Sequence, residues 1–203
     1  MKNLAAFLGL ALMFGAGCKK DEEKAPAEGP KPAPAPTDTE PKETAPAVPT
    51  QLRMIAELEP KSGSEVKGTI WFTQGKNGVT IEASVQGLTP GLHGFHIHET
   101  GDCSAEDGSS AGGHFKVGDQ PHGKPDGDAH HAGDLGNLAA RADGKAEKSF
   151  GSTAISLEPG PTFIGDRAVI VHADQDDMKT QPTGNAGGRV ACGLIKLDTS
   201  EKK

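Results

Sequence analysis

The sequence has little of what would suit it to bind nucleic acid or to cross a membrane. Its 203 residues carry 21 Lys and Arg against 28 Asp and Glu, a formal net charge of −7. This charge argues against a general nucleic-acid-binding protein, which usually shows a basic stripe. Hydrophobic residues make up only 34%, and the longest apolar run, near the N-terminus, is about a dozen residues long, too short for a membrane span. No segment shows a helical period beyond a turn or two, which argues against a helical protein.

The N-terminus, MKNLAAFLGLALMFGAGCKK, has the composition of an export signal. A lysine precedes an apolar run of signal-peptide length. Gly15, Ala16 and Gly17 lead to Cys18 and resemble the lipobox of bacterial lipoproteins, with Gly15 where leucine is usual. This pattern predicts a signal peptide over residues 1–17 and a lipid on Cys18, and Lys19 after the cysteine favours the outer membrane. The alternative is ordinary secretion with cleavage nearby.

Cysteine is scarce, and its count is odd. If Cys18 carries a lipid, Cys103 and Cys192 remain as a pair. Exported proteins meet an oxidising environment, in which paired cysteines form disulfides. A Cys103–Cys192 disulfide is therefore expected.

Proline, alanine and charged residues dominate residues 18–50, with almost no large apolar side chain. Such a segment cannot bury enough apolar surface to offset the entropy of ordering, so we expect a disordered, semi-extended tether. A folded domain is expected over residues 51–198, and a polar tail over 199–203.

The expected domain is all-β. Apolar and polar residues alternate with a period of two over residues 52–59, 66–72 and 79–85, and a turn signal at Lys76-Asn77-Gly78 separates the last two. Further extended segments are expected over 134–140, 146–150, 168–171 and 189–197. Short strands separated by glycine-rich turns indicate an antiparallel sandwich or barrel. Residues 99–131 and 173–188 are longer than ordinary loops, and such loops are typically functional.

All eight histidines lie between positions 93 and 172. In a strand, residues two apart point to the same face, so His96 and His98 can share one metal ion, while His93 is better explained as a hydrogen-bonded structural residue. Several imidazoles alone suit copper, and three imidazoles with a carboxylate suit zinc. The downstream candidates are His114, His122, His130, His131, Asp134 and His172.

Five segments, GLHGFHIHETGDC, SAGGHF, HAGDLGN, VIVHADQDD and GNAGGRVACGLI, occur in this order. They resemble the signature segments of the copper/zinc superoxide dismutase family, over about residues 51–198 and closest to its bacterial exported branch. The resemblance implies an eight-stranded antiparallel Greek-key β-barrel with two long functional loops. It also implies one copper and one zinc ion per subunit.

Residue by residue, the resemblance implies a role for each side chain of the site. It implies that His114 bridges the two metal ions and takes part in proton transfer, and that Arg189 guides the anionic substrate. It also implies that Asp176 joins a copper histidine to a zinc histidine, with Asp174 and Asp177 as alternatives for this role. Lys179 and Thr183 are candidates for steering superoxide. The implied copper ligands are His96, His98, His114 and His172, the implied zinc ligands are His114, His122, His131 and Asp134, and the implied disulfide joins Cys103 to Cys192.

The expected function is therefore dismutation of superoxide to oxygen and hydrogen peroxide by an enzyme lipid-anchored through Cys18 in a bacterial cell envelope. A copper/zinc-binding buffer on the same scaffold is the alternative, and a structural surface lipoprotein is a third. Retention of Arg189 argues against a buffer, because metal storage needs no anion guide. The partners expected are superoxide and the membrane, with no nucleic acid. A homodimer and a monomer both stay open.

Overall fold

The computed structural model describes residues 51–200. The expected signal peptide, Cys18 and the tether lie outside the described residues, as does most of the polar tail. Within 51–200 no helix has the length and apolar character needed to cross a bilayer. Eight strands and one short 3-10 turn (η1, Ser109–Ala111) make up the regular structure. The strands are β1 (Arg53–Pro60), β2 (Lys67–Gly75), β3 (Gly78–Gln86), β4 (Gly91–His98), β5 (Asp134–Ala140), β6 (Ala146–Ser152), β7 (Ala168–His172) and β8 (Arg189–Leu197).

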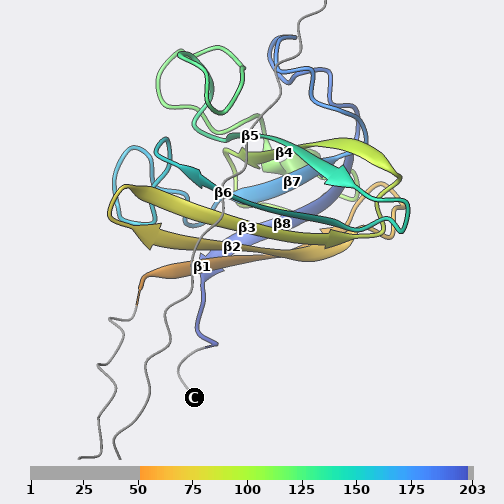
Figure 1. Cartoon of the computed structure of the whole chain (residues 1–203), viewed down its shortest axis with the longest axis horizontal. Coiled ribbons are helices and arrows are strands. Elements are labelled where there is room, and N and C mark those ends of the chain that lie inside the picture. The colour runs from red at the N-terminus through yellow and green to blue at the C-terminus, as the bar shows by residue number, and fades with distance from the viewer. Residues whose placement is uncertain (1–50, 201–203) are drawn as a thin grey trace, which may run out of the picture. The chain divides into compact units, whose positions relative to one another are not determined.

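The strands form one antiparallel sheet in the order β5-β4-β7-β8-β1-β2-β3-β6. The two end strands, β5 and β6, lie next to each other, so the sheet curls into a nearly closed barrel (Figure 1). Strands β4, β5 and β6 follow one another while β3 pairs with β6, which is a Greek-key connection. The expected all-β Greek-key barrel is confirmed.

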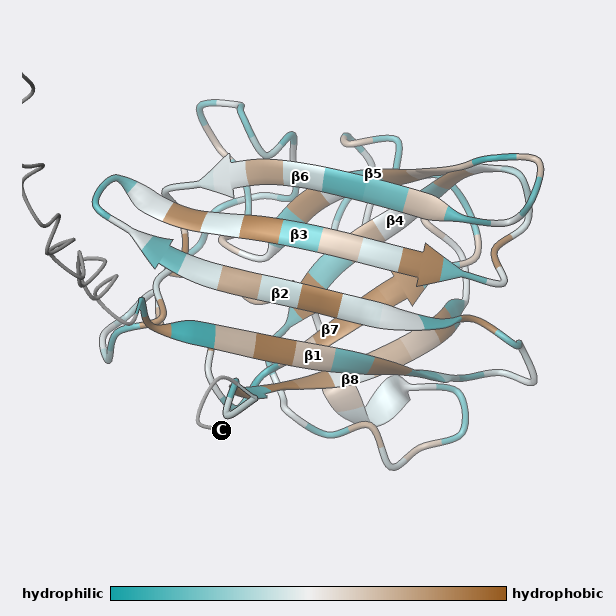
Figure 2. Cartoon of the chain, turned by 60° about the horizontal axis from the view of Figure 1, so that its bottom comes forward, coloured by the Kyte–Doolittle hydropathy of each residue, from teal (hydrophilic) through white to brown (hydrophobic). Residues whose placement is uncertain are grey.

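Alternating side chains fill the barrel. Along β3, Val79, Ile81, Ala83 and Val85 are buried and the residues between them face outward. Figure 2 shows this alternation as brown and pale bands along β3. Strands β2 and β3 meet in a two-residue turn, with Gly75 opposite Gly78. Leu52, which the sequence pattern assigns to the buried face, is instead 36% exposed, because β1 begins only at Arg53.

Both long connections leave the half of the barrel formed by β4, β5 and β7. Residues 99–133 follow β4, and residues 173–188 follow β7. Strands β4 and β7 are direct neighbours, with Phe95 opposite Val171, and both are buried along most of their length. The fold thus brings together β4, the connection that follows it and the end of β7, which between them hold all eight histidines.

Candidate metal centre

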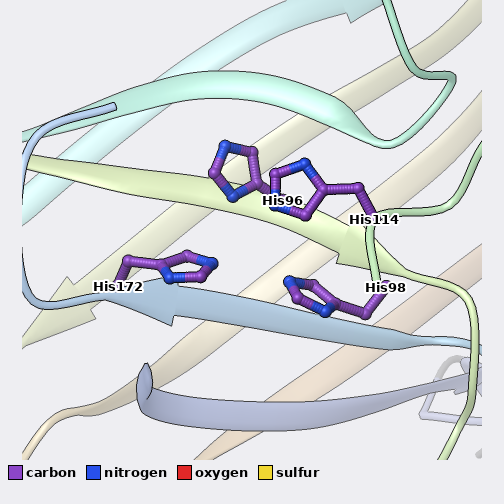
Figure 3. Close-up of side chains that lie close together, drawn as sticks. All are labelled: His96, His98, His114 and His172. Carbon is purple, nitrogen blue, oxygen red and sulfur yellow. The ribbon is translucent and has the colours of Figure 1, made fainter. Parts of the chain in front are cut away.

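Four imidazoles converge beside the antiparallel pair of strands β4 and β7. His96 and His98 project from β4, His172 is the last residue of β7, and His114 comes from the loop after β4 (Figure 3). One ring nitrogen of each lies within 4.8 Å of those of the others. All four side chains are buried. We call these four residues the imidazole group.

Local backbone pairing explains why these four rings meet. His96 and His98 lie on one face of β4, with ring centroids 6.5 Å apart, as expected for residues two apart. A bridge between His98 and His114 folds the long loop back against the end of β4. At the end of β7 the register with β8 shifts between Val171 and His172.

A second group of four ligands adjoins the first. It consists of His114, His122, His131 and Asp134, all buried, and we call it the mixed group. The Asp134 Oδ1 atom lies 2.9 Å from His114 Nδ1, 3.0 Å from His122 Nδ1 and 3.4 Å from His131 Nδ1. The other carboxylate oxygen accepts hydrogen bonds from the backbone N–H groups of Gly123 and His131. Three imidazole nitrogens and one carboxylate oxygen therefore face a common point.

His114 belongs to both groups. Its Nδ1 atom lies 2.9 Å from Asp134 Oδ1, and its Nε2 atom is buried with no hydrogen-bond partner among the described residues. One ring therefore presents a nitrogen to each group, as the bridging role implied by the resemblance requires.

Five buried ring nitrogens have no hydrogen-bond partner in the described chain: His96 Nδ1, His98 Nε2, His114 Nε2, His131 Nδ1 and His172 Nε2. Unpaired buried polar atoms are rare in native proteins and call for an explanation. Metal coordination supplies one, because it satisfies the lone pair of each nitrogen. An all-imidazole set fits copper, and three imidazoles with a carboxylate fit tetrahedral zinc. The residues present fit both ions.

Burial keeps the imidazole group ready to coordinate. Removal from water lowers the pKa of His96 to about 4 and that of His172 to about 3, and it lowers the pKa of His98 well below its ordinary range. These rings are therefore neutral at pH 7, which is the form that binds metal.

In the mixed group, burial lowers the pKa of His131, whereas neighbouring charged or hydrogen-bonding groups outweigh burial at His122 and Asp134. Burial alone would lower the pKa of His122, but Asp134 and Asp176 outweigh it and raise that pKa to about 9. Burial would likewise raise the pKa of Asp134, but hydrogen bonds from His114 and His122 hold it far below its usual range. Asp134 is therefore an anion at neutral pH, as a zinc-binding carboxylate must be.

Asp176 connects the two groups through the ring nitrogens that do not face either group. Its Oδ2 accepts a hydrogen bond from His96 Nε2 at 2.8 Å, and its Oδ1 accepts one from His122 Nε2 at 2.9 Å. These bonds leave the Nδ1 atom of each ring for its own group. The rivals are placed elsewhere: Asp174 and Asp177 are exposed, and Asp177 bonds within its own loop.

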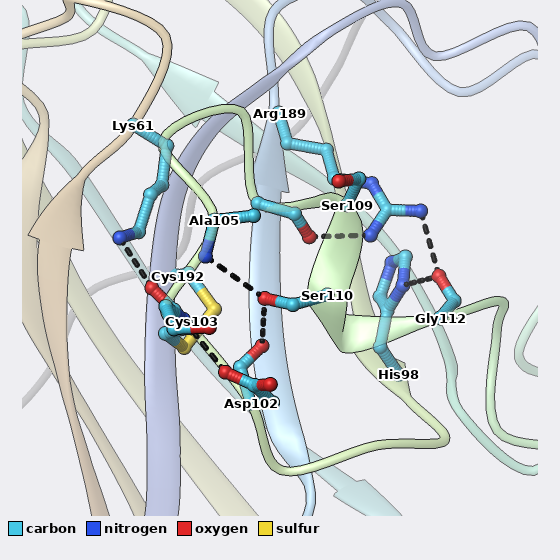
Figure 4. Close-up of a disulfide and its surroundings, with 12 residues drawn as sticks. Lys61, His98, Asp102, Cys103, Ala105, Ser109, Ser110, Gly112, Arg189 and Cys192 are labelled. Atoms are coloured by element: carbon cyan, nitrogen blue, oxygen red, sulfur yellow. Dashed lines mark hydrogen bonds between the residues drawn. A yellow bond between two sulfur atoms is a disulfide. The ribbon is translucent and has the colours of Figure 1, made fainter.

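Arg189 is fastened to the loop after β4 (Figure 4). Its Nη1 donates to the carbonyl of Gly108 at 2.7 Å, and its Nη2 donates to that of Gly112 at 2.6 Å. The Gly112 carbonyl also accepts a hydrogen bond from His98 Nδ1 at 3.0 Å. A single oxygen thus links the guanidinium to a ring of the imidazole group.

The disulfide holds this loop to the last strand. Cys103 and Cys192 are bonded, as expected, with their Cα atoms 5.8 Å apart. Cys192 lies in β8, three residues after Arg189. The bond therefore joins the loop that carries Gly108 and Gly112 to the strand that carries Arg189.

The remaining histidines lie outside both groups. His93 is buried, and its ring atoms Nδ1 and Nε2 lie 2.9 Å and 2.8 Å from the carbonyls of His172 and Thr89. This agrees with its interpretation as a structural residue. His130 is half-buried beside His131, with its Nδ1 2.7 Å from the His131 carbonyl.

Sequence reasoning missed two side-chain amides that support the site. Asn137 donates to the backbone carbonyl of Asp176 and accepts from its N–H, at 2.9 and 2.8 Å. Gln181 pairs in the same way with the backbone of His122. Asn137 lies within the signature segment HAGDLGN, which could have pointed to it. No motif singled out Gln181.

The fold and site define a class: an antiparallel β-barrel protein with two adjoining, histidine-rich metal groups. The family model for copper/zinc superoxide dismutase (SODC) matches residues 66–195, and the chain belongs to this family of copper- and zinc-dependent oxidoreductases. The chain is 45% identical over 152 residues to "Extracellular superoxide dismutase [Cu-Zn]" of Brugia pahangi, covering 70% of this chain and 75% of the relative. It is 48% identical over 144 residues to "Superoxide dismutase [Cu-Zn] 2" of Mesembryanthemum crystallinum, covering 68% of this chain and 91% of the relative.

Proposed function

We propose that the chain dismutates superoxide to oxygen and hydrogen peroxide, with copper in the imidazole group and zinc in the mixed group. The observation that carries this proposal is the guanidinium of Arg189, held beside His98 through the shared Gly112 carbonyl. A fixed, always charged fork next to the imidazole group is suited to draw a small anion toward it.

The reaction consumes two superoxide anions and two protons and yields one oxygen and one hydrogen peroxide. Bound copper would supply the alternating one-electron oxidation and reduction, while zinc has no redox chemistry. Arg189 would bind and orient each anion: two of its N–H groups are used by Gly108 and Gly112, and it carries others for the substrate.

The protons need a carrier close to the substrate. The His114 Nε2 atom faces the imidazole group while Nδ1 lies beside Asp134. We assign to Nε2 the holding and release of a proton toward the reduced substrate. Asp134 keeps the ring oriented for this step through its contact with Nδ1.

A copper/zinc buffer is the competing function on the same scaffold. A buffer needs the two ligand groups but no anion-binding guanidinium. Two hydrogen bonds, to the carbonyls of Gly108 and Gly112, fix Arg189 in place, and such fixation serves catalysis rather than storage.

The experiment that tests the proposal compares superoxide dismutation by the whole chain, loaded with copper and zinc, with that of Arg189→Ala. A hydrogen bond to a charged group is worth about 1.5–3 kcal/mol, so we expect kcat/KM to fall by roughly 10- to 100-fold. Lys196→Ala removes an exposed positive charge from the same strand and should change kcat/KM by less than about two-fold, as for a weak surface pair. Tight binding of both metals without dismutation would make the chain a buffer.

We further propose that the chain is an exported bacterial lipoprotein that protects the cell envelope from superoxide. In this proposal the chain has five parts: a signal peptide over residues 1–17, a lipid on Cys18, a tether over 18–50, the enzyme domain over 51–198 and a tail over 199–203. The disulfide supports export, since such bonds persist in oxidising compartments. The printed name of the Brugia pahangi relative, an extracellular enzyme, also favours export.

Sedimentation of the purified chain distinguishes a homodimer from a monomer.

A further inference from the structure

Gln181 lies on the second long loop, residues 173–188, and hydrogen-bonds to a residue of the first long loop, residues 99–133. Its Oε1 accepts the backbone N–H of His122 at 2.8 Å, and its Nε2 donates to the carbonyl of His122 at 2.9 Å. The same Nε2 lies 3.2 Å from the carbonyl of Lys179. The side-chain amide thus pairs with the His122 backbone as a neighbouring strand would.

This pairing is the main polar connection between the two loops. Three hydrogen bonds join residues 115–131 to residues 173–188 in the part of the chain that the structure describes. Two of them come from Gln181, and the third runs from His122 Nε2 to Asp176. Both loops therefore meet at His122.

The second long loop, which contacts His122 through Gln181, forms a compact turn between Asp176 and Gly184. The carboxylate of Asp177 accepts hydrogen bonds from the backbone N–H groups of Lys179 and Thr180 and from the Thr180 hydroxyl. Backbone bonds from Asp177 to Gly184 and from Gly184 to Thr180 complete the turn. Asp176 and Gln181 therefore belong to one compact unit.

His122 is consequently fixed at two points. Asp176 holds the far nitrogen of its ring, and Gln181 holds its backbone, which leaves Nδ1 3.0 Å from Asp134 Oδ1. With the backbone released, the ring could still bond to Asp176 but would no longer be aimed at the mixed group. Groups that orient a ligand from outside the coordination sphere set metal affinity.

We infer that Gln181 is a positioning residue for the mixed group and sets its affinity for zinc. This inference rests on the proposed function, which assigns zinc to that group. Gln181 acts through His122 and touches neither metal nor substrate.

The test measures Zn²⁺ binding to the whole copper-loaded chain in competition with a chromogenic chelator. Gln181→Met keeps the length of the side chain but removes both hydrogen bonds to His122, and we expect the dissociation constant for Zn²⁺ to rise about ten-fold. Co²⁺ placed in the mixed group should show altered visible absorption bands, because these bands report the geometry of the ligands. Thr180→Val is the matched control: it loosens the loop without touching His122 and should bind Zn²⁺ within about two-fold of the parent.

Equal affinity in the parent and Gln181→Met, or an equal loss in Thr180→Val, would overturn the inference while leaving the proposed function standing. If Gln181→Met does not fold, Gln181→Glu replaces it, since it keeps an acceptor for the His122 N–H, loses the donor to the His122 carbonyl and places a negative charge beside that carbonyl. An unchanged affinity in that variant also overturns the inference. A parent chain that takes up no Zn²⁺ would instead remove the proposed function and this inference together.

Discussion

The rings of His96 and His172 are neutral at physiological pH because they are buried. Their pKa values of about 4 and about 3 lie well below the ordinary value of 6.5. A buried base with a depressed pKa binds its proton more readily in the unfolded chain than in the folded one. Stability without metal is therefore coupled to pH through these residues.

We expect the free energy of unfolding of the metal-free chain to fall as the pH drops from 6.5 through 4 to 3. At about 1.4 kcal/mol per pH unit, His96 alone contributes roughly 3 kcal/mol to this loss. Asp134 and Asp176, whose pKa values are also depressed, add to the loss at still lower pH. His122 has the opposite sign: its raised pKa stabilises the fold below pH 6.5, and this contribution is lost as the pH rises through 9. Urea unfolding between pH 10 and pH 3 measures the profile.

The metal-loaded chain is the control for this profile. Bound metal requires neutral imidazoles and ionised carboxylates, so it competes with protons for the same atoms. Its stability should hold to a lower pH than that of the metal-free chain. A metal-free profile that stays flat from pH 7 to pH 4 would contradict the argument.

Single residues also show how far the sequence leads. The pair His96 and His98 is predictable from strand alternation, and Cys103 and Cys192 from the count of cysteines. The ligand groups that include His114 and Asp134 came from the resemblance, because residues so far apart along the chain carry no local signal of contact. Gln181 was not predictable, since its contact depends on the path of two loops.

At the scale of strands, a single side chain links β5 and β6, the two end strands whose contact closes the barrel. We call the contact between these two strands the seam. Lys148 of β6 donates from Nζ to the carbonyls of Leu135 and Asn137 in β5, at 2.9 and 3.0 Å. Its ammonium also lies 4.4 Å from the ring centroid of Phe150. Burial lowers the pKa of this lysine. One side chain therefore bonds across the two strands that end the sheet.

Lys148→Met should destabilise the barrel by about 1–2 kcal/mol, because two carbonyls lose a charged donor that methionine cannot replace. Lys145→Met, an exposed position just before the same strand, should change the stability by less than about 0.5 kcal/mol. Urea unfolding of both metal-loaded variants provides the comparison. Equal stabilities for the two would show that the seam does not depend on Lys148.

Strand positions were the most predictable feature at this scale. Residues 134–140 and 189–197 match β5 and β8. The clearest signal is in residues 79–85, whose alternation of apolar and polar residues matches the alternating burial of β3. The seam was not predictable: the pattern of Lys148 resembles that of any polar, outward-facing residue. Only the closing of the barrel brings it against β5.

At the scale of the whole molecule, all regular structure within the described residues 51–200 lies between Arg53 and Leu197. The eight strands of this range pair with one another, so anchoring and catalysis should separate cleanly. In a bacterial host, the full chain should partition into detergent. Cys18→Ser should remain in the aqueous phase with unchanged dismutase activity per metal-loaded chain. Phase partition followed by an activity assay tests this, and a Cys18→Ser chain that still enters detergent would rule out lipid on Cys18.

The shared carbonyl of Gly112 has a genetic consequence. Its backbone φ is +73°, in the left-handed region that favours glycine, so a residue with a Cβ would strain the backbone here and shift the Gly112 carbonyl. Because His98 and Arg189 both bond to this carbonyl, one such shift would disturb substrate capture and the imidazole group together. A substitution at this position cannot change one of these two properties without the other, so selection should retain Gly112, which has no side chain to bind metal or substrate, as firmly as it retains a ligand.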